Sequence, residues 1–101
     1  QAPIILWQEY EGVGGARVET ISEGLGKAIG VDEGVLVMRV RPGTPAARAG
    51  LRDGDVIVRA SGKRIRTVPE LRNILAGGDR EEGVTLLIRR ERKERDVTLR
   101  W

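Results

Sequence analysis

The stretch over residues 43–62, GTPAARAGLRDGDVIVRASG, constrains the fold of this chain more than any other. Thr44 is a good N-cap, Pro45 suits the first helical position, and Gly50 supplies the left-handed residue that ends a single helical turn. An Asp-Gly turn then leads into the apolar run Val56-Ile57-Val58. The stretch is therefore predicted to be a compact connector of strand, mini-helix, turn and strand.

The rest of the chain is predicted to supply further strands and two more helices. Ser22 is expected to cap a helix over residues 22–30, which two internal glycines weaken. Thr67 and Glu70 match a capping box and open a second helix, which Gly77-Gly78 ends. The charged residues 91–94 are predicted to form a hairpin turn. Alternation and apolar runs predict strands at residues 4–7, 17–21, 34–40, 55–60, 84–90 and 96–101.

Length and composition allow one small domain. The chain has 101 residues, of which 40% are apolar and 33% are charged, so it can bury a modest single core. No apolar run approaches the roughly 18 to 20 residues of a membrane helix. The chain starts at Gln1 and not at Met, so we expect an excised domain or mature segment of a longer protein.

The charge is unevenly distributed along the chain. The net charge is +3, with two bases against six acids in residues 1–33 and sixteen bases against nine acids in residues 34–101. A basic surface of this kind leaves nucleic-acid binding as a minor alternative. The bases are interleaved with acids and the aromatics are only Trp7, Tyr10 and Trp101, which does not favour a stacking platform for single strands.

The residue inventory excludes several kinds of catalytic site. The chain has no His and no Cys, which rules out Ser-His-Asp and Cys-His nucleophilic sites and the common zinc motifs. Ser22 and Ser61 are explained as a cap and a turn residue, and Asp53 and Asp55 as residues of one turn. We expect no catalytic residue, no metal ligands and no cofactor in this segment.

The order and spacing of the motifs over roughly residues 14–100 resemble a PDZ domain, of the bacterial kind attached to HtrA-type proteases and other envelope proteins. The resemblance implies an α+β fold, a small PDZ-like, partly open β-barrel or sandwich of five to six strands capped by two helices. It also implies one domain over residues 1–101, with an N-terminal strand and lead-in at 1–13 and the core at 14–101. The residues that carry it are 34–37 (GVLV), 42–51 (PGTPAARAGL), 54–57 (GDVI), Gly62, Glu70-Leu71 and Leu75.

The resemblance implies a peptide-binding module in which a ligand, often a free C-terminus, adds as a strand beside a helix. The ligand-pairing strand then falls on residues 16–21 and the flanking helix on residues 68–76. Helical spacing assigns Leu71 and Ile74 of that helix to the core. The implied peptide-binding residues are Gly14, Gly15, Ala16 and Arg17 in a carboxylate-binding loop, Val18, Glu19 and Thr20 on the strand, and Val68, Arg72 and Leu75 on the helix.

The loop departs from the family pattern, which places large apolar residues where this chain has Gly14 and Ala16. Two interpretations stay open: a deep pocket for a bulky terminal residue, or a groove that is lost and a domain that serves docking or structure. Arg17 either attracts a carboxylate or is a solvated residue on an exposed strand face.

The leading prediction is therefore an interaction domain and not an enzyme. Its expected partners are peptide or protein C-termini with an apolar last residue, with the parent's protease domain as a second candidate and no membrane contact in this segment. The resemblance implies a periplasmic or cell-envelope location. The main alternative is a regulatory or structural docking domain with an occluded groove, which uses Trp7, Tyr10 or Trp101 as anchors.

Overall fold

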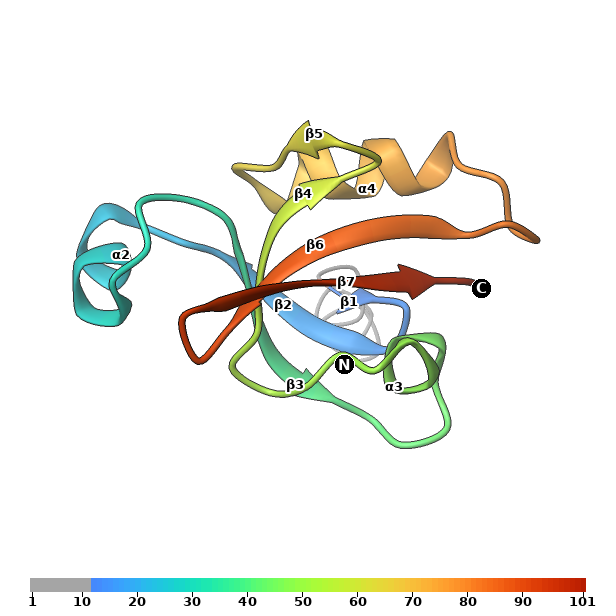
Figure 1. Ribbon diagram of the computed structural model, residues 1–101, viewed down its shortest axis with the longest axis horizontal. Helices are drawn as coiled ribbons and strands as arrows, with labels where there is room; N and C mark the ends of the chain where they lie inside the picture. Colours follow the sequence, from blue (N-terminus) through green and yellow to red (C-terminus); the bar gives the residue numbers. More distant parts are fainter. Residues whose placement is uncertain (1–11) are drawn as a thin grey trace, which may run out of the picture.

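The computed structural model of the protein describes residues 12–101, and one antiparallel sheet forms their framework (Figure 1). The strands follow the spatial order β1-β2-β3-β4-β6-β7, and β5 pairs with β4. The strand predicted at residues 4–7, together with Trp7 and Tyr10, lies outside the described residues. The strands are β1 (Gly12–Val13), β2 (Ala16–Thr20), β3 (Val35–Val40), β4 (Val56–Ala60), β5 (Lys63–Arg64), β6 (Val84–Arg90) and β7 (Lys93–Leu99).

Three helices, α2 (Glu23–Ile29), α3 (Pro45–Ala49) and α4 (Val68–Ala76), begin at the predicted caps. The Ser22, Thr44 and Thr67 hydroxyls accept hydrogen bonds from N–H groups three residues later, at 3.1, 3.3 and 3.2 Å. Glu70 completes the capping box by accepting from the Thr67 N–H. None of the three helices is long and apolar enough to cross a membrane.

The turn between β6 and β7 is shorter than the sequence predicted. Glu91 and Arg92 alone form it, with φ of 51° and 68°, and the strand pairing runs unbroken from Val84↔Leu99 to Arg90↔Lys93. Two positive φ angles give a tight hairpin whose twist matches the flanking strands. The charged residues from Lys93 onward are exposed, so they carried no alternating apolar signal.

The core is a single cluster of apolar side chains between the strands, α3 and α4. In Figure 1, α4 lies beside β4, and it contacts both β2 and β4. The predicted α+β class is thus confirmed, with β1 and β5 as short additional strands. The largest fully buried apolar side chains are Ile57, Ile65, Leu71, Leu86, Ile88, Leu99, Val35 and Val37.

A buried ion pair ties the connector to β6. Asp55, only 1% exposed, accepts hydrogen bonds from the Arg90 guanidinium at 2.8 and 2.7 Å and from the Arg52 N–H at 2.8 Å. Arg90 also donates to the Gly50 carbonyl at 2.8 Å. The hydrogen bond to Asp55 raises the pKa of Arg90. Asp55 was explained from the sequence as a turn residue, and the structure adds this ion pair to that role.

Candidate functional site

Gly14 and Gly15 form a two-residue turn between β1 and β2. Their φ angles are 56° and 87°, and Val13 lies opposite Ala16 across the turn. Two successive positive φ angles define a type I′ hairpin turn, which glycine adopts without steric cost. The two glycines predicted as a carboxylate-binding loop therefore also close a tight hairpin.

The connector, together with Arg41 just before it, hydrogen-bonds to both carbonyls of the Gly14-Gly15 turn. The Ala46 N–H, in the first turn of α3, donates to the Gly14 carbonyl at 2.9 Å, and the Arg41 N–H donates to the Gly15 carbonyl at 3.4 Å. A Cβ on Gly15 would overlap the Thr44 side chain. Because the C=O and N–H of a trans peptide point in opposite directions, the Gly15 N–H faces away from α3. The connector thus fixes the orientation of this backbone.

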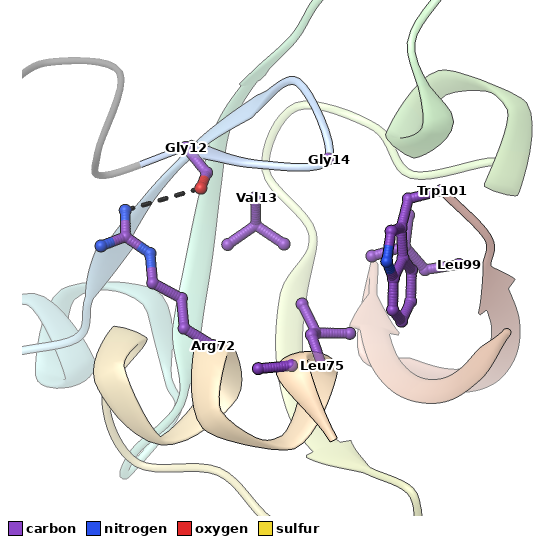
Figure 2. A pocket seen from close by; sticks show the side chains of 8 residues that line it. Gly12, Val13, Gly14, Arg72, Leu75, Leu99 and Trp101 are labelled. Carbon is purple, nitrogen blue, oxygen red and sulfur yellow. Dashed lines mark hydrogen bonds between the residues drawn. The ribbon is translucent and has the colours of Figure 1, made fainter. Parts of the chain in front are cut away.

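An apolar pocket of about 460 Å³ opens beside the turn (Figure 2). We call it the α4 pocket. Among its lining residues Arg72 is the one charged side chain, and its guanidinium donates to the Gly12 carbonyl at 3.5 Å. Figure 2 shows Val13 of the hairpin directed toward Leu75 of α4. The lining residues are Gly12, Val13 and Gly14 of the hairpin, Arg72, Leu75 and Ala76 of α4, and Leu99 and Trp101 at the end of the chain.

Five residues that line this pocket were not predicted as binding residues: Gly12, Val13, Ala76, Leu99 and Trp101. Leu99 ends β7 and is 1% exposed, and Trp101 is partly buried. A Cβ on Gly78 would come within 3.3 Å of the Trp101 ring, so the indole packs closely against that backbone. Residues two apart on a strand share a face, which is the signal that could have paired the side chains of Leu99 and Trp101. Packing against Gly78 thus holds the Trp101 ring at the wall of the pocket.

The sequence pattern of PDZ domains matches residues 36–90, more than half of the chain. This protein belongs to the PDZ domain family. Over 84% of the chain it is 37% identical to the magnetosome formation protease MamE of Paramagnetospirillum magneticum. It is also 48% identical over 46 residues to the periplasmic serine endoprotease DegP of Escherichia coli, and 45% identical over 62 residues to the putative serine protease HhoA of Synechocystis. The chain spans 12, 10 and 16% of the length of these relatives.

Solved structures share the fold. The HtrA3 PDZ domain bound to a phage-derived ligand, FGRWV, superposes with a TM-score of 0.78 at 27% identity, covering 87% of this chain and 82% of that one. The HtrA-type protease AlgW with a decapeptide gives a TM-score of 0.69 at 23% identity over 88% of this chain and 28% of that one, a likeness of fold alone.

The PDZ domain brings some of the predicted site residues together on α4. Arg72 and Leu75 line the α4 pocket, whereas Leu71 is fully buried and Ile74 packs against the core. Val68, expected in the groove, lies in the core instead with 9% exposure. It is the first residue of α4, where the helix meets β2, and helical spacing alone did not reveal this contact.

The predicted ligand-pairing strand coincides with β2. Ala16 and Val18 are buried at 1 and 2% exposure, while Arg17, Glu19 and Thr20 are exposed. One edge of β2 pairs along its whole length with β3. The opposite edge, which we call the outer edge, pairs with β1 at Ala16 and Arg17.

Arg17 stands on the exposed face of β2, directly opposite Arg39 of β3. Among residues 12–101 no carboxylate lies within ion-pairing distance of it. Within the same residues no cluster of acidic side chains has the makings of a metal site. The charge that the pocket itself offers to a ligand therefore comes from Arg72.

Proposed function

We propose that this PDZ domain binds extended peptide segments, above all free C-termini with an apolar last residue, as part of a larger protein. The observation that carries the proposal is the apolar α4 pocket at the end of β2, bordered by a glycine turn and by one cation. A peptide-bound HtrA3 PDZ domain of the same fold supports it.

In this proposal the ligand adds as a strand to the outer edge of β2. Backbone hydrogen bonds at a sheet edge give affinity that tolerates many sequences, and side-chain pockets give selectivity. The ligand's last side chain enters the α4 pocket between Leu75, Leu99 and Trp101. Its carboxylate faces the Gly15 N–H and Arg72, since charge-assisted hydrogen bonds to a carboxylate are about twice as strong as neutral ones.

The lack of a side chain at Gly14 favours one of the two interpretations of the atypical loop. Gly14 lines the pocket without a side chain, and a Cβ there would come within 3.2 Å of Leu99. A larger residue at this position would fill space that the ligand's last side chain can use. We therefore infer a deep pocket that accepts a bulky aliphatic or aromatic terminal residue.

The longer protein is proposed to be a protease or a protease-associated protein of the bacterial envelope. MamE, DegP and HhoA are named as proteases, and DegP as a periplasmic one. In that setting the domain presents bound C-termini to a neighbouring protease domain, which is a second proposed partner.

A C-terminal peptide library, screened against the whole chain and followed by a salt titration, tests the proposal. Selective enrichment of apolar last residues, with modest salt dependence, is the expected result. An absence of selective peptide binding would favour the docking role with an occluded groove. Steeply salt-dependent binding of polyanions would favour nucleic acid instead.

A further inference from the structure

The outer edge of β2 already has a strand on it. A strand has two edges, and β3 takes one of them along the whole of β2. The other edge pairs with β1, through Gly12↔Arg17 and Val13↔Ala16. A peptide that adds to β2, as the proposed function requires, must use the edge that β1 occupies.

β1 also matches the proposed ligand in its direction and in the position of its C-terminal end. It runs antiparallel to β2, and its C-terminal end lies at the Gly14-Gly15 turn, where the ligand carboxylate is placed. Val13, its last residue, is an apolar side chain at 3% exposure that lines the α4 pocket. Arg72 binds the carbonyl of Gly12, next to the position proposed for the carboxylate (Figure 2). β1 therefore makes the contacts that a terminal Gly-Val of a ligand would make.

A second contact closes the far end of the same edge. The Val68 N–H, at the start of α4, donates to the Thr20 hydroxyl at the end of β2 at 3.0 Å. The first N–H groups of a helix have no partner within the helix, so this bond satisfies one of them. It also holds the helix against the strand, where the ligand would pass between the two.

We propose that the domain is self-occupied: β1 acts as an internal ligand on β2, and a peptide binds only after β1 leaves the outer edge and the Val68–Thr20 contact opens. The apparent affinity for a peptide is then lowered by the fraction of molecules that are open. Any event that pulls β1 away from β2 raises the affinity.

A cross-strand disulfide tests this in one protein. The chain has no Cys, so a Gly12→Cys, Arg17→Cys double variant carries a single possible pair. Directly opposed residues of antiparallel strands have Cα atoms about 4.5 to 5.5 Å apart, within the range for a disulfide. Oxidation locks β1 onto β2, and reduction releases it, so the effects of the two substitutions themselves cancel in the comparison.

The measurement is fluorescence anisotropy of labelled FGRWV with a free carboxylate, titrated with the oxidised and the reduced double variant. Binding about tenfold or more weaker in the oxidised form is expected, since the open state is then excluded. The wild-type chain with and without reductant controls for the reagent. Circular dichroism of both forms establishes that each is folded.

The other outcomes separate this inference from the proposed function. Equal or tighter binding by the oxidised form would overturn self-occupation and leave peptide binding intact. Binding to neither form, nor to any member of the peptide library, would overturn both.

Thr20→Val tests the second closure independently, because it removes the hydroxyl that accepts from Val68 and keeps the side-chain shape. Tighter peptide binding is expected. Thr85→Val, at an exposed position of β6, is the matched control and is expected to leave the affinity unchanged. Unchanged or weaker binding by the Thr20 variant would show that this contact does not hold the edge closed.

Discussion

The connector around α3 and the outer edge of β2 lie on either side of the Gly14-Gly15 turn, and they are built differently. The connector is fixed by a helix cap, by the left-handed Gly50 and by the buried Asp55–Arg90 pair. The outer edge is held by two residues of β1, one contact at Thr20 and a 3.5 Å bond from Arg72. Opening this edge exposes Val13, which is 3% exposed and belongs to the core cluster, but it leaves the rest of the core in place, and a local opening costs less free energy than global unfolding. The connector is thus the rigid region, and the outer edge of β2 beside it is the region that we propose can open.

The largest effect is expected in the connector. Asp55→Ala leaves the Arg90 guanidinium, whose side chain is 12% exposed, without its carboxylate partner. Breaking a buried pair by removing one partner costs about 3 to 5 kcal/mol. Urea unfolding should show this loss, and Asp96→Asn, at an exposed position of β7, is the control. A loss no larger than the control's would mean that the pair does not stabilise the connector.

The next largest effect concerns the C-terminal carboxylate of the ligand. Amidating the C-terminus of FGRWV removes the charge that the Gly15 N–H and Arg72 are proposed to bind, and should weaken binding by about 1.5 to 3 kcal/mol. This is about tenfold or more in affinity. Calorimetry with the two peptides measures it. Equal affinities would mean that the turn is not a carboxylate site and that internal segments are the ligands.

A backbone change in the connector is expected to cost somewhat less than the loss of Asp55. Gly50 has φ of 92° with open space around it, so a side chain there meets strain and no clash. Gly50→Val should lower the free energy of unfolding by about 1 to 3 kcal/mol, with peptide affinity unchanged. Gly24→Ala, in α2, has open space and no positive φ, and should not destabilise. An unchanged melting temperature for the Gly50 variant would contradict the assignment.

The sequence predicted the connector well because its signals are local. The cap at Thr44 and the left-handed Gly50 each depend on residues within one helical turn. The Asp55–Arg90 pair joins residues 35 apart, and no local pattern indicates it.

The lining of the α4 pocket was predicted only in part, because it joins segments that are far apart in the sequence. Gly14-Gly15 suits a carboxylate loop and a type I′ hairpin equally well from sequence, and only the tertiary structure shows that β1 folds back onto β2. Trp101 joins the pocket through the packing of β7 against the rest of the domain. Val68 lies in the core and does not line the pocket, because α4 starts against Thr20.

The smallest expected effect separates the two roles of Arg72, which faces both the proposed ligand carboxylate and the carbonyl of Gly12. Arg72→Met keeps most of the stem that covers the pocket and removes the charge. A free-acid ligand loses an attraction, whereas an amidated ligand gains only from the weaker hold on β1. The preference for the free acid should therefore fall by about 0.2 to 1 kcal/mol, the range of exposed ion pairs. Arg95→Met, at an exposed position of β7 outside the pocket, controls for the loss of an arginine charge. If the preference for the free acid is unchanged in the Arg72 variant, the carboxylate is held by the Gly15 backbone alone, and Arg72 serves only to keep β1 on the edge.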